Sequence, residues 1–476
     1  MIPLTANAIV EVTGASILSG APSTTATSVS IDSRRTAAGA CFFAIRGDRK
    51  DGHEFVPAAA AAGATMLVVS APPVTVPAAG CGHPAVLQVA DTTAALQQLA
   101  GWLRRHLDPT VVAITGSLGK TTTKELATAL LRTRYRVHAT PGNLNNHWGL
   151  PLSLLGLGPG HEVMVAELAM SHAGEIRALA RLAAPDIAII TNVAPVHMEN
   201  FTDLDAVAAA KAELAEQIGA GATLIAGADD PRTAAMAARF APRVGRVLTF
   251  GRGEGADVRA TGVTTGGEGS RFDLRLPGGE RVAVRLQLPG AAGIANFLAA
   301  ATVAWALEVP VDVIAATAGE LQPLANRGAL RKLGGVRLVD ESYNASPQAV
   351  AGALDNLATL PASGRRIAVL GDMLEMGAWT EAVHREAGAQ AAAAGVDLLL
   401  AVGAQAGHVA AGAAQAGMRG EQIHCFEDAG AAGAWLAPLL ADGDAVLVKG
   451  SRGVRMERVV EAVVAAAEVT DGVRER

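Results

Sequence analysis

Residues 111–125 (VVAITGSLGKTTTKE) combine the residue types that can hold a polyphosphate. A β-branched run ends at Gly116, and Gly119, Lys120 and Thr121 follow. Glycines let backbone N–H groups approach an anion, and the start of the next helix adds positive potential. Lysine adds a mobile charge, and a threonine hydroxyl suits Mg²⁺. A purely structural glycine turn is the alternative, but Lys-Thr-Thr directly after the glycine favours nucleotide binding.

The spacing of this loop differs from that of the common phosphate loop, G-x-x-x-x-G-K-[ST]. The first glycine of that pattern would fall at Ile114. The loop alone is compatible with a GTPase, a kinase or a ligase. A GTPase would carry a guanine-reading N-K-x-D motif, and the sequence contains none.

Three further polar residues follow or accompany predicted strands of the same region. Glu167 ends the run VMVAE, and His197 follows AIITNVAPV. Open α/β sheets bind ligands at the carboxyl ends of their strands, where a carboxylate suits Mg²⁺. Lys211 lies on an alanine-rich predicted helix. Its own pattern indicates a solvated surface lysine, and a single loop histidine is also more often simply exposed.

An asparagine-rich loop adds candidates for substrate contact. Residues 140–155, TPGNLNNHWGLPLSLL, place Asn143, Asn145 and Asn146 close together on a Gly-Pro scaffold. Ordinary loop composition explains one or two such amides. Three of them predict a hydrogen-bonding surface for a polar substrate.

Two further polar segments stand at predicted strand ends near the C-terminus. Residues 339–347, VDESYNASP, offer carboxylates and amides. Residues 448–453, VKGSRG, offer Lys449, Ser451 and Arg452. These side chains suit a carboxylate or a phosphate.

The elements that must position these residues alternate between strand and helix. Strand-like runs such as TVVAIT and DIAIITNV are followed by helix-compatible segments of 10–15 residues, which predicts a mostly parallel sheet covered on both faces. SRFDLRLPGGERVAVRLQLPG predicts an antiparallel hairpin around Pro-Gly-Gly. We expect an α/β protein of three domains, at residues 1–90, 91–323 and 324–476. The first is small, and the last is a doubly wound, Rossmann-like domain.

Composition excludes several classes of function. The formal charge of the 476-residue chain is −6 and aromatic residues make up 3 %, which argues against nucleic-acid binding. No run approaches ~18 uninterrupted apolar residues, and the N-terminus lacks a basic signal-peptide region, so we expect no membrane insertion. Cys41, Cys81 and Cys425 show no metal-ligand spacing and are expected to be reduced thiols of a cytoplasmic protein. The Pro/Gly-rich residues 71–84 are expected to form a surface excursion.

Taken in order along the chain, these motifs resemble those of the Mur ligase family. The family uses a shortened loop, G-x-x-G-K-T, which Gly116 to Thr121 match, and this accounts for Ile114. SIDSRRTAAGACFFAIRGDRKDGHEF resembles a UDP-sugar-binding domain of the family. GNLNNHWGLPLSLL, DESYNASP and GDMLEMG resemble the members that add D-Ala-D-Ala to UDP-N-acetylmuramoyl-tripeptide. A D-N-P-R-type motif, expected of members that add the preceding amino acid, is absent.

The resemblance implies an ATP-dependent amide ligase of peptidoglycan precursor synthesis that acts through an acyl phosphate. It implies a cytoplasmic monomer with two Mg²⁺ ions as cofactors. It implies that Lys211 carries a carbamate that helps hold the second metal. The implied catalytic residues are Lys120, Lys211, His197 and Arg327. The implied metal ligands are Thr121, Glu167, His197 and Lys211. The implied ATP-binding residues are Gly116, Ser117, Gly119, Lys120, Thr121, Thr122, Asn296, Arg327 and Asp340.

The resemblance also implies which residues hold the other substrates. UDP-N-acetylmuramoyl-tripeptide and D-alanyl-D-alanine are expected to contact Ser33, Arg34, Asp51, Gly52, His53, Asn143, Asn145, Asn146, Tyr343, Asn344, Lys449, Ser451 and Arg452. Because the implied sites are spread over all three domains, linkers near residues 90 and 323 are expected to permit closure.

Three positions depart from the family pattern. The chain has Ala292-Gly293 where His-Asn is usual, Ala169 where glycine is usual, and Ser346 where a second asparagine is common. None removes a charge that the chemistry needs. Two alternatives stay open on the sequence: addition of the third amino acid to UDP-N-acetylmuramoyl-dipeptide, and a non-catalytic nucleotide-binding protein on the same scaffold. The identity of the third peptide residue, diaminopimelate or lysine, is also open.

Overall fold

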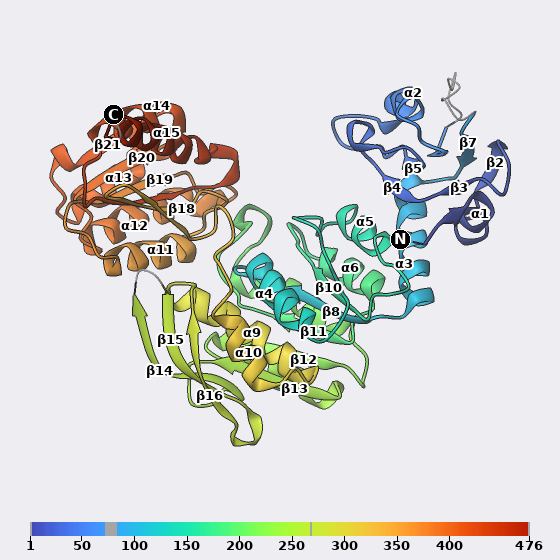
Figure 1. The fold of residues 1–476 in the computed structure, drawn as a ribbon, viewed down its shortest axis with the longest axis horizontal. Coiled ribbons are helices and arrows are strands. Elements are labelled where there is room, and N and C mark those ends of the chain that lie inside the picture. The colour runs from blue at the N-terminus through green and yellow to red at the C-terminus, as the bar shows by residue number, and fades with distance from the viewer. Residues whose placement is uncertain (1, 72–82, 267–268, 475–476) are drawn as a thin grey trace.

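The computed structural model describes residues 2–71, 83–266 and 269–474. Three α/β domains follow one another along an arc, with the central domain between the other two (Figure 1). Most of the predicted surface excursion at residues 71–84, together with Cys81, lies outside the described residues. No helix within the described ranges has the length and apolar character needed to cross a membrane.

The N-terminal domain is built on a five-stranded sheet in the order β2-β7-β6-β5-β4. Strands β4 to β7 are parallel neighbours, and β2 adds antiparallel to β7. The fully buried Cys41 lies on β5. The elements are β1 (Leu4–Thr5), α1 (Ala6–Thr13), β2 (Ser16–Ser19), β3 (Thr25–Ala26), β4 (Ser28–Ser30), η1 (Ser33–Arg35), β5 (Ala40–Phe43), η2 (Gly52–Phe55), α2 (Val56–Ala61), β6 (Met66–Val69) and β7 (Ala85–Gln88).

Helix α3 (Thr92–Leu107) joins this domain to the next. Asp91 caps it by accepting hydrogen bonds from the N–H groups of Thr93 and Ala94. Its apolar face packs against α1 on one side and against α5 (Gly149–Leu155) and α6 (Glu175–Ala183) on the other. One continuous apolar core therefore runs from the first domain into the second.

The central domain contains a nine-stranded sheet in the order β16-β15-β14-β13-β12-β11-β8-β10-β9. Its strands are parallel from β9 to β14, and β15 and β16 add antiparallel, which confirms the predicted hairpin. Pro277–Gly279 forms the turn, with Gly278 at φ 86°. The strands are β8 (Thr110–Thr115), β9 (Val137–Ala139), β10 (Val163–Glu167), β11 (Ile187–Ile190), β12 (Thr223–Gly227), β13 (Arg246–Gly251), β14 (Val258–Gly266), β15 (Gly269–Arg275) and β16 (Arg281–Leu286).

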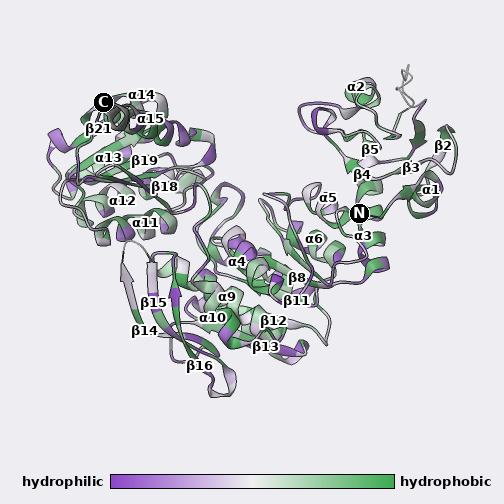
Figure 2. Ribbon diagram, viewed as in Figure 1, coloured by the Kyte–Doolittle hydropathy of each residue, from purple (hydrophilic) through white to green (hydrophobic). Residues whose placement is uncertain are grey.

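Helices cover both faces of this sheet. Successive side chains of a strand point to opposite faces, so each strand contributes to two apolar cores. Along β8, Val111 and Ala113 enter the core under α3, α5 and α6, while Val112 and Ile114 enter the core under α4 and α9. Apolar residues accordingly gather between the layers (Figure 2). The remaining elements are α4 (Lys120–Arg132), η3 (Met198–Asn200), α7 (Leu204–Glu216), α8 (Pro231–Phe240), η4 (Ala241–Arg243), η5 (Pro277–Gly279), α9 (Gly290–Ala306) and α10 (Val311–Ala318).

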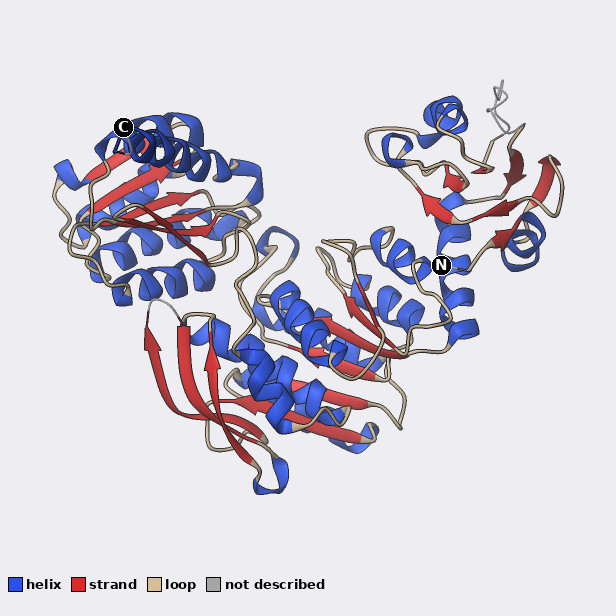
Figure 3. Ribbon diagram, viewed as in Figure 1, coloured by secondary structure: helices blue, strands red, loops and turns tan. Residues whose placement is uncertain are grey.

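The C-terminal domain contains a six-stranded sheet in the order β17-β18-β22-β19-β20-β21, with helices on both faces (Figure 3). All neighbours are parallel except β17 and β18. The elements are β17 (Ala329–Leu333), β18 (Val336–Glu341), α11 (Pro347–Thr359), β19 (Arg366–Gly371), η6 (Gly377–Trp379), α12 (Thr380–Ala393), β20 (Leu398–Val402), α13 (Ala406–Gln415), η7 (Gly420–Gln422), β21 (Ile423–Phe426), α14 (Ala429–Leu436), η8 (Ala437–Leu439), β22 (Ala445–Lys449), η9 (Arg452–Val454) and α15 (Glu457–Arg474).

Candidate active site

The loop between β8 and α4 depends on two glycines with left-handed backbone, Gly116 at φ 149° and Gly119 at φ 79°. A side chain at Gly119 would overlap the carboxamide of Asn296 on α9. A side chain at Gly116 would overlap the hydroxyl of Thr191, just after β11. Only glycine fits both the conformation and the space. The first N–H groups of α4 therefore stand at a tight turn without intrahelical acceptors, as an anion site requires.

The segment after β11 holds the loop in place. Asn192 accepts hydrogen bonds from the N–H of Ser117 (3.0 Å, on its carbonyl) and of Leu118 (2.9 Å, on Oδ1). The hydroxyl of Thr191 donates to the carbonyl of Leu118 (2.7 Å). Ser117 also exchanges two hydrogen bonds with the backbone of Ala194, so its hydroxyl serves the loop itself. Sequence reasoning missed Thr191 and Asn192, although both stand at a strand end on the ligand edge.

Lys120 bends back over the loop that precedes it. Its Nζ donates to the carbonyls of Gly116 (2.9 Å) and Ser117 (3.2 Å). Desolvation lowers the pKa of Lys120 from its ordinary value, the charge of Glu167 opposes that shift, and the charge of Arg327 adds to it. The ammonium therefore lies close both to a carboxylate of the central domain and to an arginine of the following linker. The neighbouring Thr122 is a partly exposed residue of the first turn of α4.

Glu167, at the end of β10, is a buried carboxylate with one oxygen satisfied. Its Oε1 accepts hydrogen bonds from the hydroxyl of Thr121 (3.1 Å) and the amide of Asn145 (2.8 Å). Its Oε2 is buried and has no hydrogen-bond partner among the residues that the structure describes. An unpaired buried carboxylate oxygen is costly, and a cation is the partner that satisfies it best. The Thr121 hydroxyl and this oxygen thus make a donor set that fits Mg²⁺.

Lys211 is buried inside α7, with 2 % of its surface exposed. The residue pattern alone indicated a surface lysine, and the structure places it in the interior. Its ammonium forms no hydrogen bond or ion pair with any residue in the described ranges. Desolvation lowers the pKa of Lys211 well below the ordinary lysine value, and the charge of Lys120 adds to the shift. Burial therefore favours the uncharged form of Lys211, and the charge of Lys120 in the phosphate loop acts in the same direction.

His197 lies in the loop that leads into η3, with a left-handed backbone at φ 54°. Its Nδ1 contacts the carboxylate of Glu375, which belongs to the C-terminal domain. Burial lowers the pKa of His197, Glu375 opposes that shift, and the charges of Lys120 and Lys211 add to it. His197, Lys120 and Lys211 therefore share one site, which the C-terminal domain touches through Glu375. Glu375 was not among the predicted site residues.

Two arginines flank one aromatic ring where the C-terminal domain begins. The guanidinium of Arg327 stacks on the ring of Tyr343 at 3.8 Å from its centroid. Arg452 lies over the same ring at 5.3 Å and donates to the Tyr343 hydroxyl (3.4 Å). Neither arginine forms an ion pair with a residue that the structure describes. Both are therefore free to receive an anionic ligand.

Other predicted residues of this domain are engaged within the fold. Lys449 is buried and pairs with Glu341 at 2.6 Å, and it also donates to the carbonyl of Asn344 (3.2 Å). The Asn344 side chain accepts from the N–H of the next residue. Ser451 is buried, and its hydroxyl accepts the N–H of Leu374 (3.0 Å). These contacts shape the loops that present Tyr343 and Arg452.

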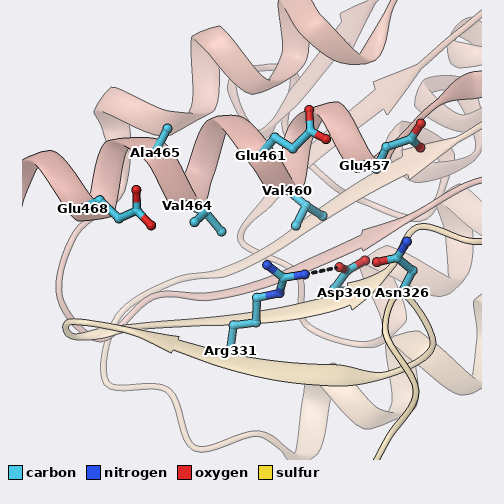
Figure 4. Close-up of a pocket in the computed structure, with 9 residues that line it drawn as sticks. All are labelled: Asn326, Arg331, Asp340, Glu457, Val460, Glu461, Val464, Ala465 and Glu468. Carbon is cyan, nitrogen blue, oxygen red and sulfur yellow. Dashed lines mark hydrogen bonds and ion pairs between the residues drawn. The ribbon is translucent and has the colours of Figure 1, made fainter.

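Asp340 borders a cavity of about 390 Å³ between the β17–β18 hairpin and α15 (Figure 4). Its Oδ1 accepts from the backbone and hydroxyl of Ser342, and its Oδ2 pairs with Arg331 (3.2 Å). Carboxylates of α15, at Glu457, Glu461 and Glu468, line the opposite wall. An acidic lining suits hydroxyl groups better than phosphates, which leaves the phosphates to the loop at Lys120.

The asparagine-rich loop divides into functional and structural members. Asn145 holds Glu167, as described above. The Oδ1 of Asn146 accepts the N–H groups of Trp148 and Gly149, which fixes the turn that leads into α5. Asn143 is exposed, and its side chain bonds to no residue in the described ranges. The buried Lys124, which sequence reasoning missed, fixes the loop by donating to two of its carbonyls (2.7 and 3.1 Å).

The predicted residues of the N-terminal domain form a small network around η2. Asp51 Oδ1 accepts from the backbone N–H and the Nδ1 of His53 (3.0 and 2.6 Å), and these hydrogen bonds lower the pKa of Asp51 to about 2. The Nε2 of His53 accepts the N–H of Ser70 (2.9 Å). A side chain at Gly52 would clash with the backbone of Ile45.

The other pair of this domain lies on η1. Ser33 begins the short helix, and Arg34 pairs with the capping Asp32 at 2.7 Å while staying mostly exposed. That hydrogen bond lowers the pKa of Asp32 and leaves part of the guanidinium available to solvent or ligand. The structure thus groups the predicted residues of the N-terminal domain on two adjoining loops.

Comparison with known proteins identifies relatives that match most of the chain. Family models described as "Mur ligase family, catalytic domain", "Mur ligase middle domain" and "Mur ligase, glutamate ligase domain" match residues 25–109, 114–304 and 326–452. UDP-N-acetylmuramoyl-tripeptide–D-alanyl-D-alanine ligase of Escherichia coli K12 is 36 % identical over 440 residues, covering 91 % of this chain and 93 % of the relative.

Solved structures give the same answer. The fold is similar to MurF from Acinetobacter baumannii, with a TM-score of 0.88 and 29 % identity over 97 % of this chain and 99 % of the other. It is also similar to MurF ligase from Thermotoga maritima in complex with ADP, with a TM-score of 0.80 and 29 % identity over 93 % and 98 % of the two chains. The chain belongs to the Mur ligase family.

Proposed function

We propose that this chain is an ATP-dependent ligase that joins D-alanyl-D-alanine to UDP-N-acetylmuramoyl-tripeptide in peptidoglycan precursor synthesis. The relatives and solved structures above carry names of that activity. One observation in the site supports the reaction class best. Lys120 and Arg327, from the central domain and the linker, bring two positive charges together beside the buried Glu167, whose Oε2 has no partner.

The reaction begins by converting a poor acyl donor into a good one. The peptide carboxylate attacks the γ-phosphorus of ATP, the bond to the bridging oxygen breaks, and ADP leaves. The amine of D-alanyl-D-alanine then attacks the acyl phosphate, loses a proton, and the tetrahedral intermediate releases phosphate to leave an amide. Lys120 and Arg327 offset the repulsion between the carboxylate and the phosphates and stabilise charge on the transferring group.

The residues at the phosphate loop fit Mg²⁺. Thr121, Glu167 and His197 would hold it, and when bound the ion would neutralise phosphate charge and orient the phosphoryl group. No three His, Cys, Asp or Glu side chains converge as a ready-made metal cage within the described ranges. This is in keeping with Mg²⁺, which usually takes one or two carboxylates together with substrate phosphates.

Lys211 supports the proposal in a different way. Carbamylation requires an uncharged amine, whose nitrogen attacks the carbon of CO₂ and loses a proton. Lys211 is buried, unpaired among the described residues, and has a strongly lowered pKa. We assign it as the carbamylated residue, which would place an anion able to face a second Mg²⁺ beside the positive charge of Lys120. A ¹³C NMR signal from ¹³C-bicarbonate that disappears in Lys211→Met would verify this.

The remaining substrate groups are assigned to the outer domains. Ser33, Arg34 and the loop of Asp51, Gly52 and His53 face the UDP-muramoyl end. The Arg327–Tyr343–Arg452 group takes anionic groups, with Arg452 on the carboxylate of the incoming dipeptide. Asn296 lies against the phosphate loop on the adenine side, and Asp340 takes the ribose. The enzyme is proposed to work as a cytoplasmic monomer, where ATP and the nucleotide-linked precursor are both present.

A phosphate-release assay tests the proposal directly. UDP-N-acetylmuramoyl-dipeptide and -tripeptide are each combined with diaminopimelate, lysine or D-alanyl-D-alanine. Turnover is expected with the tripeptide and D-alanyl-D-alanine alone. Turnover only with the dipeptide and a single amino acid would assign the chain to the preceding ligation instead. ATP binding without turnover in any combination would identify a non-catalytic nucleotide-binding protein.

A further inference from the structure

The contact between His197 and Glu375 joins two domains at the centre of the site. His197 belongs to the central domain, and Glu375 to the segment Gly371–Gly377 (GDMLEMG) that follows β19. The sequence analysis singled out this segment without assigning a role to any of its residues. Only the Nδ1 of His197 is engaged, and no residue in the described ranges hydrogen-bonds its Nε2.

The segment that carries Glu375 is held at three consecutive residues by three different elements. The carboxylate of Asp372 accepts the N–H groups of Ala404 (2.9 Å) and Gln405 (3.0 Å). The N–H of Met373 donates to the Nε2 of the fully buried His384 (2.9 Å). The N–H of Leu374 donates to the Ser451 hydroxyl (3.0 Å). Glu375 therefore projects from a rigid support rather than from a loose loop.

The two domains also meet through their backbones at this point. The N–H of Glu199 donates to the carbonyl of Glu375 (3.2 Å). His197 and Glu375 both have left-handed backbones, at φ 54° and 65°, which non-glycine residues seldom adopt. Gly377 approaches so closely that a Cβ there would lie 3.0 Å from the Cα of Glu199. Strain of this kind persists where the surrounding structure determines it, and it gathers at functional sites.

We propose that Glu375 is a positioning residue that prepares His197 for metal binding when the C-terminal domain docks. Its carboxylate accepts the Nδ1–H of His197, which leaves the lone pair on Nε2. Histidine ligands of metals commonly donate the other ring N–H to a carboxylate in this way. The charges of Lys120 and Lys211 act on the same ring, so the imidazole lies near the phosphate loop. The inference rests on the proposed function, because that function requires His197 as a ligand.

A simpler explanation is that the pair merely fastens two domains together. A fastening contact would use the same Nδ1–H, so the tautomer tests whether the hydrogen bond exists, and the affinity of the site for a metal ion separates the two explanations. The tautomer can be read without metal, nucleotide or substrate. This reading is also independent of whether the chain turns over its proposed substrates.

The experiment is ¹⁵N NMR of the full chain labelled at histidine. The chain has 11 histidines, and His197→Gln identifies the signal of interest. We expect the Nδ1–H tautomer in the unmodified chain and a shift toward Nε2–H in Glu375→Ala. Glu375→Gln keeps the size of the side chain but can present either an oxygen or an NH₂ group to Nδ1, so it should give a mixture. Glu386→Gln, an exposed glutamate on α12, is the matched control and should change nothing.

Metal affinity provides the second measurement. Mn²⁺ binding in the presence of an ATP analogue, followed by electron paramagnetic resonance, should weaken by about 10- to 100-fold in Glu375→Ala. Circular dichroism and thermal unfolding show whether each variant is folded, and Glu375→Gln serves if the alanine variant is not. Unchanged Mn²⁺ affinity in a folded Glu375→Ala variant overturns the inference, whether or not the His197 tautomer shifts. If the wild type instead lacks ligase activity while the tautomer shifts as expected, the proposed function fails and the positioning contact stands.

Discussion

At the scale of single residues, the site gathers positive charge inside an acidic chain and then limits it. The formal charge of the chain is −6, yet three basic residues lie close together in the site. The charge of Arg327 lowers the pKa of Lys120, and the charge of Lys120 lowers the pKa of Lys211. Burial disfavours the charged form of Lys211, and Glu167 favours the charged form of Lys120. One cation beside an amine whose charge is disfavoured is an arrangement that receives phosphates without holding an excess of unpaired charge.

Lys120 is the residue on which phosphoryl transfer depends most directly. Lys120→Ala should lower phosphate release by about 100-fold or more, because a cation at the transferring group is lost. The fold should persist, since Lys120 donates only to two carbonyls of its own loop. Steady-state phosphate release and thermal unfolding provide the measurements. Lys332→Ala, at an exposed lysine on β17, is the control, and equal turnover in both variants would contradict the assigned role.

Lys211 should lower the stability of the fold, because its burial disfavours the charged form of the side chain. Lys211→Met, measured in buffer free of CO₂, should increase the free energy of unfolding at pH 7, by about 1.4 kcal/mol for each unit by which the native pKa lies below the unfolded one. The native lysine holds fewer protons than the unfolded one, so wild-type stability rises with pH toward the ordinary lysine pKa of 10.5. The advantage of the methionine variant is therefore complete at pH values below the native pKa of Lys211 and shrinks as the pH rises toward 10.5.

Urea unfolding at several pH values measures this difference. The methionine variant should lack the part of the pH dependence that Lys211 causes, and its ligase activity should fall. If the methionine variant is instead less stable than the wild type at pH 7, Lys211 stabilises the fold through its own interactions, and the prediction is contradicted.

At the scale of elements, the phosphate loop is built by what packs against it. Gly119 and Gly174 each precede a helix, α4 and α6, with positive φ values of 79° and 89°. A Cβ at Gly119 would overlap Asn296, whereas no atom of the described residues outside the neighbouring backbone lies within 4 Å of a Cβ at Gly174. The two positions thus share backbone strain and differ in crowding.

Gly119→Ala should therefore destabilise the fold by more than the roughly 1 to 3 kcal/mol expected for strain alone, and Gly174→Ala by about that amount. Nucleotide affinity should fall in the first variant and stay unchanged in the second, because only α4 starts at the phosphate loop. Urea unfolding and calorimetric titration with ADP measure the two effects. Equal losses of stability and equal ADP affinities would show that the contact with Asn296 is unimportant.

The elements themselves were largely accessible from sequence, since their signals are local. Periodicity and turn residues predicted the parallel strands, the glycine loop and the Pro-Gly-Gly hairpin, and the structure confirms them. The supports of the site were not predictable in this way. Asn192, Lys124 and Glu375 act on residues far away in the chain or in another domain, and no local pattern marks such a partner. The burial of Lys211 is likewise a tertiary property that its alanine-rich helix conceals.

At the scale of the whole molecule, the two outer domains are attached to the centre in different ways. One continuous core includes Ile9 and Met66 of the first domain, Leu96 of α3 and Leu150 of α5. The C-terminal domain instead follows an irregular linker between α10 and β17, in which Asn326 has φ 61°, and it has apolar cores of its own. Arg327 lies on this linker, so nucleotide phosphates that bind Arg327 would act directly on the connection between the two domains. We therefore expect the C-terminal domain to move more than the first.

Small-angle X-ray scattering tests this expectation. An ATP analogue that cannot be hydrolysed, added with UDP-N-acetylmuramoyl-tripeptide, should decrease the radius of gyration, because the phosphates draw Arg327 and its domain toward Lys120. The analogue alone should produce most of the change. Arg327→Ala should contract less at saturating analogue, while Arg239→Ala, an exposed arginine on α8, should contract like the wild type. An unchanged radius of gyration with both ligands bound would mean that the domains already occupy their working arrangement, with Glu375 seated on His197 from the start.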